Sequence, residues 1–237
     1  MPEYRPFRIG SSQMGGNMIN LTGIKKIYKS GKIYVEALKG IDLVIQDGEM
    51  IVLTGVSGSG KSTLLNLIGA MDSVTEGRIF IDEEDITNYS TGQLTNFRAR
   101  HVGFIFQTFN LIPVLNVYEN IVIPMALKGQ AYKKEEVLRL IDQVGLSKYI
   151  KHRPDELSGG QRQRIAIARA IVHKPRYIMA DEPTANLDSN TARTIIELLQ
   201  DINEKMKVTI VFASHDKSIF EAIDKKIVLT DGLIVNN

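Results

Sequence analysis

Short apolar runs alternate along the chain with longer segments whose apolar residues recur every three to four positions. The short runs predict β-strands at 19–28, 33–45, 50–54, 77–82, 102–106, 177–180, 208–213, 227–230 and 233–235. The longer segments predict helices at 61–70, 91–101, 133–144, 161–172, 189–206 and 217–223. A wider helical block at 111–149 is predicted to break at Pro113, Pro124 and Gly129.

This order of elements predicts an α/β fold in three parts. Alternating strands and helices indicate a mostly parallel sheet covered on both faces. The first two strands, joined by the turn Ser30-Gly31-Lys32, indicate a small antiparallel β subdomain at the N-terminus. The segment 108–164 indicates a helical subdomain inserted into a core made of 18–107 and 165–237. Residues 1–17 lack periodicity and predict a flexible extension or a tag.

Composition narrows the class of protein. The 237 residues are 43% hydrophobic and 24% charged, which is ordinary for a globular protein with a sizeable core. The chain has no cysteine, so disulfides, thiolate zinc sites and cysteine nucleophiles are excluded. A net charge of +2 is too small to indicate nucleic acid as a partner. No run of about 18 apolar residues is found, so the chain is not expected to span a membrane, and its N-terminus shows no signal peptide.

A glycine-rich loop joins the strand at 50–54 to the helix after it, and it reads Gly55-Val56-Ser57-Gly58-Ser59-Gly60-Lys61-Ser62-Thr63. The sequence fits the phosphate-binding P-loop, G-x-x-x-x-G-K-[ST]. The glycines let several backbone N–H groups point at one anion, and the helix adds its positive end. Lys61 supplies a charge for the outer phosphates, and the Ser62 hydroxyl can bind Mg²⁺. The sequence therefore predicts a nucleotide site in a P-loop NTPase core.

Two adjacent carboxylates follow the apolar strand at 177–180. Since the carboxyl ends of parallel strands meet at one edge of the sheet, Asp181 and Glu182 are expected beside the P-loop. Asp181 can reach the shell of a Mg²⁺ ion. Glu182 can polarise a water molecule for attack on the γ-phosphorus. The alternative is a strand-end pair that forms a turn or caps a helix.

Other polar residues also follow buried strands. Gln107 follows the strand at 102–106, and its amide can bind Mg²⁺ or orient water; an ordinary polar strand end is the alternative. His215 follows the strand at 208–213 and can donate to a γ-phosphate oxygen. His101, His152 and His173 lie in polar or turn segments and are predicted to be solvated.

A second anion-binding sequence opens the helix predicted at 161–172. It reads Ser158-Gly159-Gly160-Gln161 after Leu157, and combines a hydroxyl, free N–H groups and a positive helix end. A simple helix cap at Ser158 explains the local sequence. It does not explain why a chain with one P-loop has a second helix start suited to phosphate.

With these motifs in this order, the chain from about residue 18 onward resembles the ATP-binding subunit of ABC transporters. The resemblance makes 55–63 the Walker A loop, Gln107 the Q-loop, 157–161 the signature, Asp181 the end of Walker B, 185–188 the D-loop and His215 the switch histidine. Ala185 stands where the family often has Ser or Gly. The implied roles are catalysis by Glu182, His215 and Lys61, metal binding by Ser62, Gln107 and Asp181, and adenine stacking on Tyr28.

The resemblance implies a head-to-tail dimer of two such chains. ATP and Mg²⁺ are the implied cofactors, with each ATP held between the P-loop of one chain and Ser158, Gly159, Gly160 and Gln161 of the other. Asp188 is implied to lie at the dimer seam. The helical block is implied to receive integral membrane subunits, which places the chain in the cytoplasm on the inner face of the cell membrane.

A finer resemblance covers residues 102–113 and 118–121. These segments look like those of one branch of the ABC family, which serves lipoprotein release, macrolide and peptide export, and cell division. The alternative is a soluble ABC ATPase. The DNA-repair type carries long coiled coils and the translation type carries two ATPase units, but the iron–sulfur assembly type fits the length. A P-loop GTPase or kinase is disfavoured, since 157–161 has no role there and no guanine-reading Asn-Lys-x-Asp is present.

Overall fold

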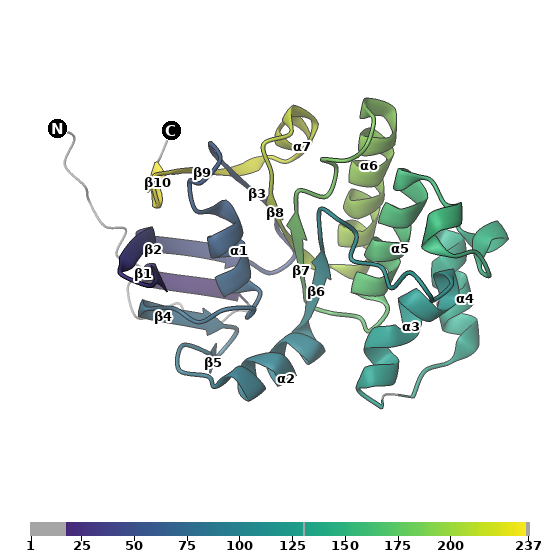
Figure 1. Ribbon diagram of the computed structural model, residues 1–237, viewed down its shortest axis with the longest axis horizontal. Coiled ribbons are helices and arrows are strands. Elements are labelled where there is room, and N and C mark those ends of the chain that lie inside the picture. The colour runs from purple at the N-terminus through teal and green to yellow at the C-terminus, as the bar shows by residue number, and fades with distance from the viewer. Residues whose placement is uncertain (1–17, 130, 236–237) are drawn as a thin grey trace.

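The computed structural model describes residues 18–129 and 131–235 (Figure 1). The prediction for residues 1–17 lies outside the described residues. Among the described residues, no helix is long and apolar enough to cross a membrane.

A six-stranded sheet forms the centre of the molecule, in the order β10-β9-β3-β8-β7-β6. Neighbours from β9 to β6 are parallel, and β10 is antiparallel to β9. The strands are β3 (Met50–Thr54), β6 (Val102–Ile105), β7 (Tyr177–Asp181), β8 (Thr209–Ala213), β9 (Lys225–Thr230) and β10 (Leu233–Val235). The mostly parallel sheet predicted from the alternation is confirmed. The sequence did not predict that β8 lies between β3 and β7.

The N-terminal strands form a separate antiparallel sheet, in the order β2-β1-β4-β5. Its strands are β1 (Met18–Ser30), β2 (Ile33–Gln46), β4 (Glu76–Ile81) and β5 (Glu84–Asp85). Glu84 was expected in a turn but pairs with Ile81 as a strand. The turn is shorter than expected because Asp82 adopts a left-handed φ of 56°, and a strand of two residues is too short to show a period.

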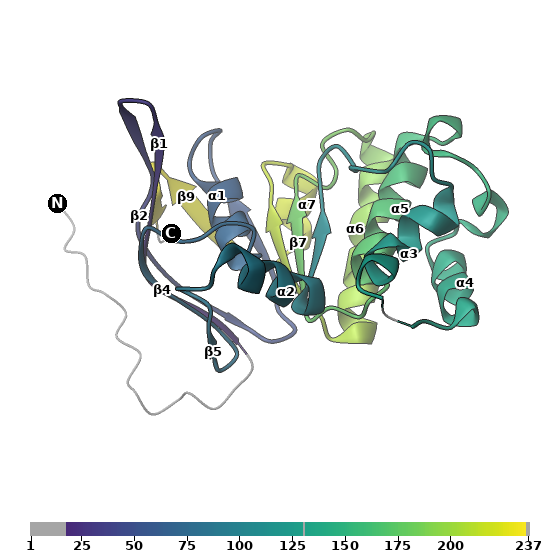
Figure 2. The same cartoon turned by 60° about the horizontal axis from the view of Figure 1, so that its bottom comes forward.

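Helices cover both faces of the main sheet. The helices of the described residues are α1 (Lys61–Ile68), α2 (Thr91–His101), α3 (Val117–Leu127), α4 (Lys134–Gln143), α5 (Gly159–Ile171), α6 (Ser189–Met206) and α7 (Lys217–Ala222), with 3₁₀ turns at Ser147–Tyr149 and Pro154–Glu156. Helix α1 packs with Tyr177 and Met179 of β7, whereas α5 and α6 pack with Ile178 and Ala180. Because side chains alternate along a strand, α1 and α5 lie on opposite faces of the sheet, as Figures 1 and 2 also show.

The helical segment has a hydrophobic cluster of its own, formed by α3, α4 and one side of α5. Ile165 and Ala168 of α5 and its C-cap Val172 belong to this cluster, whereas Ile167 and Ala170 of α5 belong to the cluster under the main sheet. Helix α5 therefore joins the two parts, and the division at 164/165 stays a prediction.

The expected break at Pro124 is wrong, because α3 continues through this proline. Helix α3 starts only after Asn116, which forms a capping box with Glu119. Its buried residues Ile121, Val122 and Met125 pack into the cluster on both sides of Pro124. Tertiary packing thus compensates for the hydrogen bond that the proline removes.

Candidate functional site

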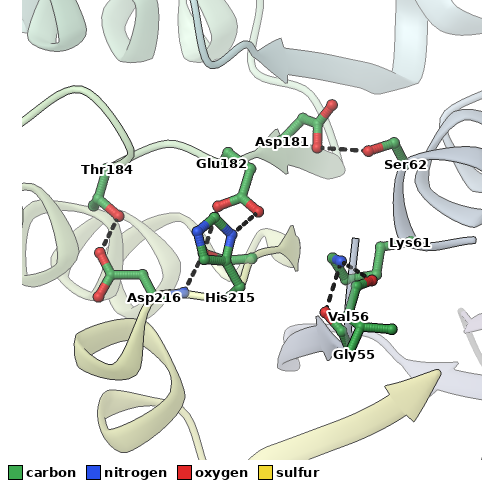
Figure 3. A network of polar contacts seen from close by, with 10 residues as sticks. Gly55, Val56, Lys61, Ser62, Asp181, Glu182, Thr184, His215 and Asp216 are labelled. Carbon is green, nitrogen blue, oxygen red and sulfur yellow. Dashed lines mark hydrogen bonds and ion pairs between the residues drawn. The ribbon is translucent and has the colours of Figure 1, made fainter. Parts of the chain in front are cut away.

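The P-loop joins β3 to α1, and Figure 3 shows its residues Gly55, Val56 and Lys61 with Ser62 at the start of the helix. Gly58 and Gly60 have φ of 78° and 106°, values that glycine adopts without strain. Gly55 is needed for space as well, since an added Cβ would lie 2.1 Å from the carbonyl oxygen of Leu229. No side chain caps the N-terminus of α1, which leaves its first N–H groups for a ligand.

Lys61 is held directly over this loop. Its Nζ donates to the carbonyl oxygens of Gly55 and Val56 at 2.8 and 3.0 Å, and the residue is only 9% exposed. The ammonium group therefore lies within the concave part of the loop, where its charge can meet a phosphate.

Ser62 and Asp181 are brought together from α1 and β7. The Ser62 Oγ donates to Asp181 Oδ1 at 3.1 Å. Burial raises the pKa of the Asp181 carboxyl and the charge of Glu182 adds to this, while Ser62 and Lys61 act in the opposite direction. A hydroxyl and a carboxylate at this distance are the hard oxygen donors that Mg²⁺ binds.

This donor pair fits Mg²⁺ but cannot fill its coordination shell alone. Among the described residues, no group of three His, Cys, Asp or Glu could hold a metal ion. Mg²⁺ commonly takes one or two protein ligands and completes its shell with phosphate and water oxygens. The residues present therefore suit a metal that arrives with a nucleotide.

Glu182 lies at the centre of a second polar cluster (Figure 3). Its Oε1 lies 2.6 Å from His215 Nδ1, and its Oε2 accepts a hydrogen bond from Ser214 Oγ at 3.0 Å. The Glu182 backbone is left-handed, with φ of 46°, and its N–H donates to the carbonyl of Ala213 on β8 at 2.8 Å. Because β8 adjoins β7, its end delivers His215 beside Glu182. The sequence analysis did not single out Ser214, which directly follows the fully buried strand β8.

Gln107 is exposed after β6, at the edge of the main sheet. Its backbone carbonyl accepts a hydrogen bond from Asn186 Nδ2 at 2.9 Å. The hydrogen bonds found among the described residues do not join its side chain to Ser62 or Asp181. Its role as a metal ligand stays a prediction.

Tyr28 lies on β1, and the residue is 39% exposed. The phenol donates to Asp72 Oδ2 at 3.0 Å, and Lys26 Nζ lies 5.0 Å from the ring centroid. These contacts fix the ring and leave part of it accessible. Adenine stacking on Tyr28 stays a prediction.

Ser158 is the N-cap of α5. Its Oγ accepts from the N–H of Gln161 at 3.3 Å, and the Gln161 side chain accepts from the N–H of Ser158 at 2.8 Å. An added Cβ at Gly160 would lie 2.5 Å from the Thr191 methyl carbon, so glycine here permits close packing of α5 on α6. The helix cap is therefore real, while the Ser158 O–H can still donate to a ligand.

Asp188 caps the next helix, α6. Its Oδ1 accepts from the N–H groups of Asn190 and Thr191 at 3.1 and 3.0 Å. These bonds hold the pKa of the Asp188 carboxyl below its usual value, led by Thr191. They fix the end of the 185–188 segment next to the start of α5.

The prediction that His173 is solvated is wrong. Both ring nitrogens are buried and have no hydrogen-bond partner among the described residues. Burial lowers its pKa to about 4, and the charge of Lys128 adds to this effect. The residue lies two positions after the last residue of α5.

Stability should therefore depend on pH through His173. Between pH 6.5 and 4 the unfolded chain binds more protons at this residue than the folded chain, so stability is lost as the pH falls. From pH 7 to pH 5, we expect the free energy of unfolding of the unmodified protein to fall by about 2 kcal/mol more than that of the His173→Gln variant. Urea unfolding at both pH values measures this difference. Equal pH dependence of the two proteins would contradict a neutral, buried His173.

Three features define a P-loop nucleotide hydrolase: a loop suited to phosphate, a carboxylate hydrogen-bonded to the serine of that loop, and a glutamate beside a histidine. Comparison with known proteins shows to which family of these hydrolases the chain belongs. Residues 38–185 match the family model described as ABC transporter. The lipoprotein-releasing system ATP-binding protein LolD of Legionella pneumophila is 43% identical over 221 residues, covering 91% of this chain and 97% of LolD.

Two further similarities extend this result. The macrolide export ATP-binding/permease protein MacB of Bdellovibrio bacteriovorus is 40% identical over 217 residues, covering 92% of this chain but 33% of MacB. The ATP-binding cassette MJ0796, solved as a dimer in a post-hydrolysis state with ADP and Pi, is similar with a TM-score of 0.84 at 39% identity, covering 92% of this chain and 97% of that one.

The chain belongs to the ABC transporter family. It is an ATP-binding, ATP-hydrolysing transporter subunit, which confirms the family, the fold class and the activity expected from the sequence. The branch named from 102–113 is confirmed too, since relatives carry lipoprotein-release and macrolide-export names. The iron–sulfur alternative gains no support from them.

Proposed function

We propose that two copies of this chain close head to tail around two ATP molecules and drive integral membrane subunits. One observation supports the proposed dimer. The N-termini of α1 and α5 are both suited to bind phosphate, and the two helices lie on opposite faces of the main sheet. A single nucleotide cannot contact both within one chain. A second chain can bring its Ser158–Gln161 segment to the first chain's P-loop, and the dimeric form of MJ0796 supports such an assembly.

Each ATP is held by contacts from both chains in this proposal. The P-loop residues bind the phosphates of one nucleotide, with Lys61 as the charged donor and Tyr28 stacked on the adenine. Ser62, Asp181 and Gln107 would hold a Mg²⁺ ion, which would offset negative charge on the phosphates. Ser158, Gly159, Gly160 and Gln161 of the partner face the γ-phosphate, and Asp188 lies at the seam.

Hydrolysis is assigned to the cluster around Glu182. Its carboxylate polarises the attacking water, a contribution of roughly 10²–10⁴ in rate. Ser214 and His215 fix the carboxylate through its two oxygens. His215 is largely exposed, with 74% of its side chain accessible, so it can also donate to the γ-phosphate.

The helical part, 108–164, is proposed to receive the membrane subunits at the inner face of the cell membrane. Val114 and Leu127, two apolar side chains on this part, are 71% and 83% exposed and so are accessible to a partner. The chain corresponds to only a third of MacB, whose name includes a permease. No nucleic-acid partner is proposed.

The test is capture of the membrane partner. Tagged Glu182→Gln protein with ATP is expected to retain a multi-span membrane protein from detergent-solubilised membranes, identified by mass. Lys61→Ala protein, treated identically, should retain much less, because closure requires bound ATP. Recovery of soluble assembly factors alone would reject the transporter partner.

A further inference from the structure

The backbone just after Gln107 is strained. Phe109 and Asn110 have φ of 61° and 48°, two consecutive left-handed residues that are not glycine. L-residues avoid this region because Cβ crowds the backbone. Two turn bonds, from Phe109 N–H to Phe106 and from Asn110 N–H to Thr108, close the turn. Such a turn persists only where surrounding contacts hold it.

Arg169 of α5 supplies that hold. One terminal nitrogen donates to the Asn110 carbonyl at 2.5 Å and the other to the Phe109 carbonyl at 2.6 Å. Arg162, also on α5, places its guanidinium 5.3 Å from the Phe109 ring centroid. The planar fork of arginine suits two neighbouring acceptors, which lysine does not match.

Arg169 is not part of a charge pair that would explain its position. No carboxylate of the described residues forms an ion pair with it, and burial lowers its pKa. A partly buried guanidinium is costly unless its N–H groups are bonded. Its two hydrogen bonds to the carbonyls of Phe109 and Asn110 therefore offset the cost of burying the guanidinium group.

The turn thus connects two parts of the proposed ATP site. At its start is Gln107, whose carbonyl is held by Asn186 of the D-loop. The end of the turn, at Phe109 and Asn110, is bonded to Arg169 on α5, the helix that Ser158 caps. Gln107 and Arg169 are distant in sequence, so the link is a tertiary contact that no motif of either segment reveals.

We propose that Arg169 is a positioning residue that ties the turn after Gln107 to the signature helix α5, so that the two move as one body. This inference rests on the proposed head-to-tail dimer. With the tie intact, the Ser158–Gln161 segment is presented to the partner's nucleotide in a fixed orientation. Without it, the P-loop still binds ATP, but closure of the dimer is weakened.

The experiment compares closure with nucleotide affinity. Arg169→Gln is introduced into the Glu182→Gln protein, and the ATP-dependent monomer–dimer equilibrium is followed by light scattering. We expect the dimer dissociation constant to rise about tenfold or more, the loss of one charge-assisted tie. Affinity of the monomer for a fluorescent ATP analogue should change less than about twofold, because the P-loop is untouched.

Arg164→Gln is the matched control. Arg164 lies on the same helix and donates to the Val144 carbonyl at 3.1 Å and to Thr194 Oγ1 at 3.4 Å, away from the turn. It should leave the dimer equilibrium near that of the parent. An equal defect in Arg164→Gln, or unchanged dimerisation in Arg169→Gln, would overturn the proposal.

Two variants of Asn110 test the turn itself. Glycine adopts left-handed φ freely, so Asn110→Gly added to Arg169→Gln should restore much of the dimerisation. Asn110 is exposed, and Asn110→Val disfavours the left-handed conformation without opening the core. We expect Asn110→Val to reproduce the dimer defect even if Arg169→Gln fails to fold. Dimerisation of Asn110→Val like that of the parent would reject the proposal.

Failure of the inference differs from failure of the proposed function. If the Glu182→Gln parent itself does not dimerise with ATP, the proposal of a head-to-tail dimer is rejected, and this inference is rejected with it. If the parent dimerises and the Arg169 and Asn110 variants do so equally well, only the positioning role is lost. Urea unfolding of each variant at the assay temperature shows that the proteins compared are folded.

Discussion

Replacing Glu182 by glutamine is expected to slow ATP hydrolysis by about two to four orders of magnitude while ATP still binds. Glutamine keeps the size of the side chain and can still bond Ser214 and His215. It cannot act as a base, since a neutral amide does not take the proton of the attacking water. Phosphate release at saturating ATP measures the rate, and a fluorescent ATP analogue measures binding separately.

The same variant should accumulate as a dimer in ATP. Closure needs the γ-phosphate as the group shared by both chains, so ATP should raise the mass to about twice the 26.5 kDa of the chain and ADP should not. Glu197→Gln is a suitable control, because Glu197 is an exposed α6 residue paired with Arg193 at 3.2 Å. Unchanged turnover in Glu182→Gln would remove Glu182 from the role of base.

The fold was predictable where a pattern is local. Periodicity predicted the strands of the main sheet and the helix at 91–101, which is α2, whereas the start of α3 after Asn116 was not predicted. Strand order was not predictable, since any order satisfies the same alternation of polar and apolar residues. The continuation of α3 through Pro124 depends on packing against α4 and α5, which the segment itself does not encode.

The candidate site shows the same limit. Motif spacing and the geometry of parallel sheets were enough to expect Ser62 near Asp181, and the two are 3.1 Å apart. The pairing of His215 with Glu182 requires β8 next to β7, and this adjacency is a tertiary fact. Ser214 and Arg169 were missed for another reason: a serine after a buried strand and an arginine within a helix look ordinary in sequence.

Replacing Lys61 by alanine is expected to weaken ATP binding itself, by roughly ten- to a hundredfold. A charge-assisted hydrogen bond to phosphate contributes about 1.5–3 kcal/mol. The loss should be greater for ATP than for AMP, because Lys61 lies over the P-loop and is proposed to contact the outer phosphates, which AMP lacks. Titration with fluorescent analogues of the two nucleotides measures this difference.

Lys32→Ala is the matched control for this prediction. Lys32 lies in the exposed turn between β1 and β2, so its removal changes the net charge by the same amount without touching the P-loop. If both variants lose affinity equally, general electrostatic attraction explains the effect and Lys61 has no special contact. If Lys61→Ala binds ATP normally, the 55–63 loop does not hold the phosphates. A selective loss in Lys61→Ala would place the outer phosphates at this loop, where Ser62 and Asp181 also converge.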